Sequence, residues 1–266
     1  MRSGAGGKSR LSPRRDDAET SNIGSRKRVK DALATLAGRW SGRHLRHVRD
    51  MQPLSSPEQV FAWCGRAMRT TGVDALFALD RQLGQIVRTT VQPIVGQMRL
   101  TWWYEALRAL DYAPPPAQPL LTELATRVLP AGVTGSALAP MSEGWEILLD
   151  DERSDAASLK EFARLRGGGL FAAVGCLLGA TSDLLEQAGM IWALADLATN
   201  VTRDALREQA RATAIALSEQ AFAQRWDDAR MLGALALDAR AAMLGQGAPG
   251  GPRRAAAVAR FRLLGR

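Results

Sequence analysis

The segment between Val73 and Leu110 most constrains how this chain folds, because its apolar residues recur every three or four positions. That spacing gathers them on one side of a helix, and such a side must be buried against other helices. Pro93 interrupts the pattern, since proline lacks an N–H group and disfavours helix in the residue before it. We therefore predict two helices, the second starting near Ile94. The core side of this second helix is expected to carry Met98, Trp102, Ala106 and Leu110.

The remaining chain continues this helical character without strand-like alternation of apolar and polar residues. Helices are predicted on both sides of the stiff link at residues 113–119, and Trp145 is expected to pack inward. A long helix is expected from Leu184 to Ala205 or beyond. The three glycines at 167–169 have no strand before them and no Lys-Ser/Thr after them. We expect them to let helices approach closely or bend, and not to bind a nucleotide.

These patterns predict an all-α protein with a single helical domain over residues 51–246, packed around one central cavity. A linker and a basic C-terminal helix are expected over residues 247–266. No apolar run in the sequence reaches membrane-spanning length, and the N-terminus has no signal-peptide core. We therefore expect a cytoplasmic protein, with peripheral contact to a membrane left open.

Positive charge is concentrated in residues 1–50, which hold 13 Lys and Arg against 5 Asp and Glu. The other 216 residues hold 22 of each and carry no net formal charge. A basic run of this kind can touch nucleic acid or an anionic membrane, but charge runs are usually solvated. We therefore expect a basic disordered leader, or translated sequence ahead of the true start, and no nucleic-acid partner.

Histidine and cysteine limit the chemistry of the domain. Both histidines, His44 and His47, lie in the leader, so residues 51–266 supply neither a histidine general base nor a histidine-based triad. Cys64 and Cys176 lack the spacing of metal ligands or of a Cys-x-x-Cys motif. We expect both cysteines to be reduced and buried.

Several short motifs follow one another in a specific order. ALFALDRQL at residues 75–83 is followed by a proline and then by Arg99-Leu100, Trp102-Trp103, Glu105-Ala106-Leu107, Pro119-Leu120 and the run 189–204. In these motifs the chain resembles the squalene/phytoene synthase family of head-to-head prenyl transferases, over roughly residues 59–244. The resemblance implies a helical fold of the isoprenoid-synthase type. It also implies a site where Mg²⁺ neutralises a departing diphosphate.

The resembled family holds Mg²⁺ with aspartate-rich motifs on two facing helices, since this ion prefers carboxylate oxygens. Laid on this sequence, the aspartates of the first motif fall on Gly84, Gln85 and Arg88, none of which offers a carboxylate. The second motif falls on Asn200 and Asp204, where one acid of the pair remains. The metal-binding pattern of the family is therefore incomplete in this chain.

Asp196 stands one helical turn before Asn200, so Asp196, Asn200 and Asp204 are expected on one helix face. This stack is either a remnant metal site or a salt-bridged stripe near Arg203 and Arg207. We favour the stripe, because the opposite helix has lost its acids.

These departures predict a catalytically degenerate protein. A branch of the resembled family, which includes the phytoene-synthase-like mitochondrial complex I assembly factor, also lacks the full aspartate motifs. The resemblance to this branch implies a role in assembly of a respiratory complex, or in holding a lipid or isoprenoid in the cavity. No cofactor is then expected. The alternative is an active prenyl transferase with a rebuilt Mg²⁺ site.

Arginine and tryptophan residues near the expected cavity carry the remaining predictions. Arg88 is expected to pair with Asp204 across the cavity. Arg99, Trp102 and Trp103 either line the cavity or pack the helices together. We favour packing, in which the two tryptophans bury a large area and Arg99 pairs with an acid.

Overall fold

The computed structural model describes residues 72–150, 153, 155–247 and 251–266. All of them belong to the second of two compact units of the chain, Gly42–Arg266. The described residues form helices and no strand, which confirms the predicted all-α class. None of the described helices is long and apolar enough to cross a membrane. The basic leader and both histidines lie outside the described residues.

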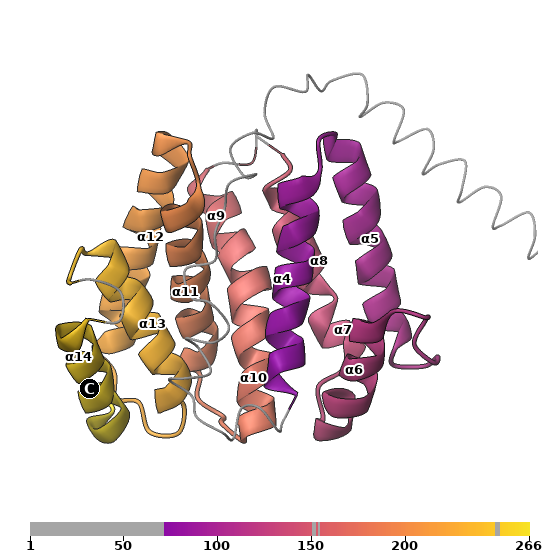
Figure 1. Cartoon of the computed structure of the whole chain (residues 1–266). Helices are drawn as coiled ribbons and strands as arrows, with labels where there is room; N and C mark the ends of the chain where they lie inside the picture. Colours follow the sequence, from indigo (N-terminus) through magenta and orange to yellow (C-terminus); the bar gives the residue numbers. More distant parts are fainter. Residues whose placement is uncertain (1–71, 151–152, 154, 248–250) are drawn as a thin grey trace, which may run out of the picture. The chain divides into compact units, whose positions relative to one another are not determined.

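The helices follow one another with short connections, and Figure 1 shows them side by side. A π-helical turn, η3, joins α9 to α10. The elements are α4 (Val73–Thr89), α5 (Pro93–Ala109), α6 (Pro119–Arg127), η2 (Leu129–Ala131), α7 (Gly135–Leu138), α8 (Pro140–Ile147), α9 (Ala156–Ala163), η3 (Arg164–Gly168), α10 (Gly169–Leu178), α11 (Leu184–Asn200), α12 (Asp204–Phe222), α13 (Arg230–Met243) and α14 (Pro252–Leu264).

Helix α11 forms the centre of the described bundle. It packs against α12, α13, α10 and η3, and it is apolar around nearly its whole circumference. A helix of that kind requires burial on all sides, and every residue of α11 from Ala188 to Ala198 is buried. Helix α4 buries an apolar side against α10, α6 and α8, as its sequence periodicity predicts.

The triple glycine brings η3 into direct backbone contact with α11. A Cβ atom added to Gly167 would lie 2.0 Å from the carbonyl oxygen of Gly189, and one on Gly189 would strike Gly167 in return. Only glycine at both positions allows this approach. The prediction that these glycines serve helix packing is therefore confirmed, and the π turn carries Arg166 into the interior of the bundle.

Helix α5 buries a different side from the one that its sequence predicts. Ala106 and Leu110 are buried as expected, but Met98 and Trp102 are exposed. The helix packs on α4, α7 and α8, and apolar residues occur nearly all round it, so its pattern singles out no face. Besides Ala106 and Leu110, the side that faces these helices carries Gly96, Leu100, Trp103 and Leu107.

Two further expectations are wrong. The long helix expected through Ala205 ends at Asn200, because Val201 adopts an extended conformation and Asp204 starts a new helix. Val201 and Thr202 are β-branched, which favours extended backbone. Cys176 is exposed and not buried, while Cys64 lies outside the described residues.

The basic C-terminal helix packs on the rest of the bundle. Helix α14 begins at Pro252 and places Val258 and Phe261 against α13. The Phe261 ring lies 5.8 Å from that of Trp226 and 5.6 Å from that of Phe222, centroid to centroid. These contacts make α14 part of the hydrophobic core.

Asp111, just after α5, holds the start of α7. Its carboxylate accepts hydrogen bonds from the backbone N–H groups of Gly135 and Ser136 and from the Ser136 hydroxyl. Desolvation opposes these bonds, but they outweigh it and hold the pKa of Asp111 below its ordinary value.

We expect Asp111→Asn to cost about 1 kcal/mol at neutral pH, because an amide nitrogen cannot accept the two hydrogen bonds that Ser136 donates to Oδ2. A depressed pKa stabilises the fold above the unfolded value of about 4, and that stabilisation is lost as pH falls through the folded value. The difference from the wild type should therefore shrink below pH ~4 in urea unfolding. A constant difference from pH 7 to 3 would contradict this role.

Candidate functional site

The most unusual feature of the bundle is a buried arginine held by acids from two helices. Arg166 in η3 is 3% exposed. Its Nε and Nη2 donate to Oδ1 and Oδ2 of Asp80 on α4, at 2.9 and 3.0 Å. Nη2 also lies 2.7 Å from Oδ2 of Asp196 on α11. One guanidinium therefore joins a buried carboxylate of α4 to a buried carboxylate of α11.

Aromatic rings enclose this ion pair. The guanidinium carbon lies 4.0 Å from the ring centroid of Trp145 and 4.9 Å from that of Trp192. The indole N–H of Trp145 also donates to Oδ1 of Asp80, at 3.0 Å. Indole faces attract a cation more strongly when water is excluded. Asp80, Trp145, Arg166, Trp192 and Asp196 are called the Arg166 cluster below.

The cluster holds two negative charges against one positive charge, and Arg88 on α4 reduces the imbalance. Burial alone lowers the pKa of the Arg166 guanidinium, but Asp80 and Asp196 outweigh it and raise that pKa above its ordinary value. The pKa of Arg88, in contrast, is lowered, mainly by burial. Repulsion from Arg166 lowers it further, and attraction to Asp196 and Asp80 partly offsets the change. Arg166 is therefore a permanent cation at this position.

Gly84 faces the cluster, one turn after Asp80. A Cβ atom at Gly84 would lie 2.8 Å from Cη2 of Trp145, so the absence of a side chain makes room for that ring. Gln85 is exposed and accepts a hydrogen bond from Nη2 of Arg88 at 3.2 Å. Of the three positions expected to carry the first motif, Gly84 packs on Trp145, Gln85 is exposed and Arg88 is half-buried beside Gly84.

Asp196, Asn200 and Asp204 do not form one stripe. The Asn200 amide donates to Oδ1 of Asp196 at 3.1 Å, which ties those two together. The Asp204 side chain is 90% exposed and pairs with Arg207 at 2.6 Å, because it begins α12. The predicted pair between Arg88 and Asp204 is therefore wrong.

Arg99, Trp102 and Trp103 lie on different sides of α5. Trp103 is buried and its ring meets that of Trp102 edge to face, so its predicted packing role is confirmed. Trp102 and Arg99 point away from the bundle and line no interior site. Arg99 makes no ion pair within the described residues, contrary to the expected pairing.

Sequence reasoning missed the members of the cluster that matter most. Asp80 lies within the apolar face of α4, between Leu76 and Leu83, and an acid at such a position requires a buried partner. Arg166 stands directly before the three glycines, and no sequence motif singles it out. An acid within the apolar face of α4 is the signal that indicates a buried partner, whereas Arg166 follows Arg164 in a charged segment that gives no comparable signal.

The residues of the cluster do not suit Mg²⁺. This ion needs carboxylate oxygens that can turn toward it while it keeps several waters. Here both carboxylates are bonded to a guanidinium, and indole rings pack around it. Across the residues for which coordinates are described, no group of three or more His, Cys, Asp or Glu side chains is placed to hold a metal.

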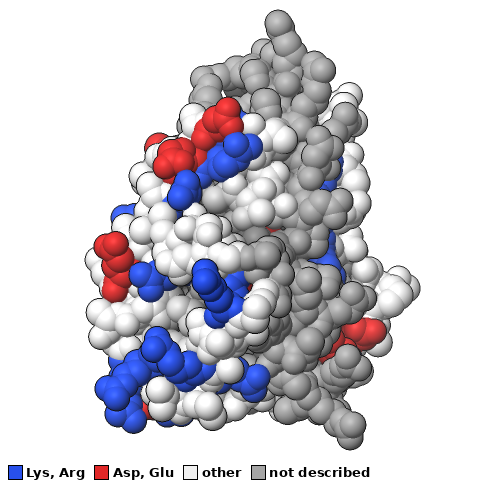
Figure 2. All heavy atoms as spheres, turned by 60° about the vertical axis from the view of Figure 1, so that its left-hand side comes forward, with Lys and Arg blue, Asp and Glu red and all other residues white. Residues whose placement is uncertain are grey.

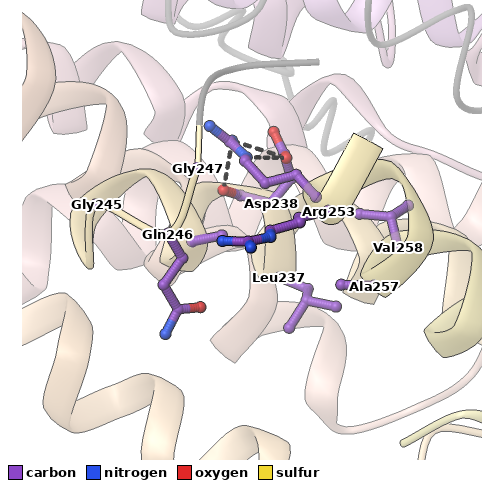
Figure 3. Close-up of a pocket in the computed structure, with 10 residues that line it drawn as sticks. Leu237, Asp238, Gly245, Gln246, Gly247, Arg253, Ala257 and Val258 are labelled. Carbon is purple, nitrogen blue, oxygen red and sulfur yellow. Dashed lines mark hydrogen bonds and ion pairs between the residues drawn. The ribbon is translucent and has the colours of Figure 1, made fainter. Parts of the chain in front are cut away.

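A pocket of about 350 Å³ lies away from the cluster, between α13 and α14 (Figure 3). Arg254 is bonded to Asp238 through Nε, at 2.8 Å, and through Nη2. The Arg253 side chain extends across the pocket toward Gln246. Figure 2 shows basic residues gathered over this end of the molecule. The exposed arginines of α14 and of the two residues after it are Arg253, Arg260, Arg262 and Arg266.

Comparison with known proteins found no family model, no curated protein and no solved structure that matches this chain.

Proposed function

We propose that this protein is a non-catalytic helical protein of the squalene/phytoene synthase type, which acts through binding and not through chemistry on a diphosphate. The observation that carries the proposal is the guanidinium of Arg166 between Asp80 and Asp196. Helices α4 and α11 each present a carboxylate to one point, and an arginine supplies the cation there.

The Arg166 guanidinium and a divalent metal would compete for the same carboxylate oxygens of Asp80 and Asp196. To release Asp80 and Asp196 for a metal, Arg166 would have to leave two indole faces and cross the bundle. Separating one member of a buried ion pair from the other costs about 3–5 kcal/mol. Catalysis at this point would therefore begin from a strongly disfavoured arrangement of the site.

The packing of indole rings around Arg166 favours a role in assembly of a protein complex over a role in holding a lipid. An isoprenoid chain needs an apolar space, but Trp145 and Trp192 fill the region around Arg166. We therefore propose assembly of a respiratory complex as the role, with a cytoplasmic location. For the peripheral membrane contact left open above, the basic α14, which also exposes Leu263 and Leu264, is the surface that we propose.

The test is release of pyrophosphate from farnesyl or geranylgeranyl diphosphate in the presence of Mg²⁺. We expect no release above a protein-free blank, since the two carboxylates are committed to Arg166. Mg²⁺-dependent release that disappears in a folded Asp196→Asn variant would establish the alternative, an active prenyl transferase. Thermal unfolding of that variant serves as the control that its fold is intact.

A further inference from the structure

The pocket between α13 and α14 combines a cationic side chain with an apolar wall (Figure 3). Its volume of about 350 Å³ lies at the small end of the range for small-molecule sites. Leu237, Ala257 and Val258 supply apolar carbon to the wall, and the Arg253 side chain extends across the space beside them. A ligand that fills this pocket therefore needs a charged or polar end and a carbon body.

The charges of the pocket favour an anion. Among the described residues that line it, the only acid is Asp238, and Arg254 neutralises this acid through Nε and Nη2, which lie 2.8 and 2.7 Å from Oδ1. Arg253 makes no ion pair within the described residues. No Asp or Glu follows Asp238 in the sequence, whereas six arginines do. The positive charge of Arg253 is therefore not compensated by the pocket, which favours a negatively charged ligand.

The pair between Arg254 and Asp238 also fixes the position of Arg253. Arg254 is 5% exposed, and its Nη2 donates to the backbone oxygen of Asp238 at 2.8 Å. Val258, one turn later on the same side of α14, is buried as well. The first turn of α14 is thus held on α13, and Arg253 directly precedes Arg254 in that turn. A side chain that starts from a fixed backbone loses less freedom when it binds a ligand.

We propose that this pocket binds a phosphate monoester, with the phosphate on Arg253 and the carbon body against Leu237 and Ala257. A guanidinium donates two parallel hydrogen bonds to phosphate oxygens. A phosphate monoester carries about two negative charges at neutral pH. The positive field of the basic end of the molecule, seen in Figure 2, therefore favours it over a carboxylate.

Such a phosphate has two sources, a soluble ester or the headgroup of phosphatidic acid in a membrane. Arg260 and Leu264 follow Arg253 by seven and eleven residues, so all three lie within about 40° of one another around α14. A lipid source would use this face, and only that source rests on the membrane contact proposed for α14. The pocket lies away from the Arg166 cluster, so the inference does not depend on the proposed lack of catalysis.

The first test is isothermal titration calorimetry of the full chain with glycerol 3-phosphate at physiological salt. We expect saturable binding at one site. Arg253→Gln removes the paired charge and should raise the dissociation constant about tenfold or more. Arg260→Gln is the matched control, because Arg260 is exposed on the same face but does not line the pocket. It lies about 10.5 Å further along the helix, where salt screens most of its effect, so binding should be nearly unchanged.

The second test changes the shape of the pocket and keeps its charge. Ala257→Phe places a ring in the pocket and should raise the dissociation constant about tenfold or more, because the carbon body of the ester loses its space. Ala256→Phe is the control, since Ala256 is also exposed on α14 but does not line the pocket, and it should bind as wild type does. Acetate should bind more weakly than the ester, since it carries less charge and almost no carbon body.

Vesicles of phosphatidylcholine with and without phosphatidic acid distinguish the two sources. With a lipid source, co-sedimentation with the phosphatidic acid vesicles should fall in both Arg253→Gln and Ala257→Phe. With a soluble source, only the binding of glycerol 3-phosphate should respond to Ala257→Phe. The proposal is overturned if neither kind of binding depends on Ala257, since the basic helix would then attract anions without using the pocket. Acetate binding as tight as that of the ester, or no binding of the ester up to about 10 mM and none of the vesicles, would also overturn it.

Discussion

Replacing Arg166 with methionine is expected to destabilise the protein by about 3–5 kcal/mol, the usual cost of leaving a buried charge without its partner. Asp80 and Asp196 would then face each other in a site that excludes water. The measurement is urea unfolding at neutral pH. Arg164→Met is the matched control, since Arg164 lies in the same π turn but pairs with Glu161 in an exposed position. It should cost less than about 1 kcal/mol.

A rescue variant separates the loss of charge from the loss of shape. Adding Asp80→Asn and Asp196→Asn to Arg166→Met removes the repelling carboxylates and should recover a large part of the stability. An Arg166→Met variant as stable as wild type would contradict the role given to the cluster.

Gly167→Ala is expected to produce the second large effect, a loss of about 3 kcal/mol from overpacking. Its Cβ would lie 2.0 Å from the carbonyl oxygen of Gly189, and a backbone atom in a buried helix cannot move aside as a side chain can. Gly169→Ala is the control, because the nearest atom to its Cβ is Cγ of Met141 at 3.5 Å. That substitution should be neutral or gain up to about 1 kcal/mol from helix propensity.

The two glycine variants are compared by thermal unfolding and by tryptophan fluorescence. Because Gly167 follows Arg166 directly, displacement of η3 should also disturb the indole rings that pack on the guanidinium. Equal melting temperatures for Gly167→Ala and Gly169→Ala would show that η3 and α11 have room to separate without cost.

The sequence by itself determined the elements that rest on local physics. Helical spacing of apolar residues predicted α4 and the all-α class, and Pro93 predicted the break before α5. The inward packing of Trp145 and the packing role of the triple glycine were also predictable, because large rings and missing side chains have few other uses. The absence of acids at Gly84 and Gln85 is a direct property of the sequence.

Only the tertiary structure decided which side chains meet. Helix α5 is apolar nearly all round, so its buried face was set by where α4, α7 and α8 lie, and Trp102 emerged on the outside. The break at Val201 moved Asp204 out of line with Asp196 and onto the surface. Asp80 and Arg166 are 86 residues apart, and no local rule pairs an acid with a base at that distance. The close approach of η3 to α11 carries Arg166 into the interior, beside Asp196, and the packing of α4 in the same bundle brings Asp80 to that guanidinium, where no charge is stable alone.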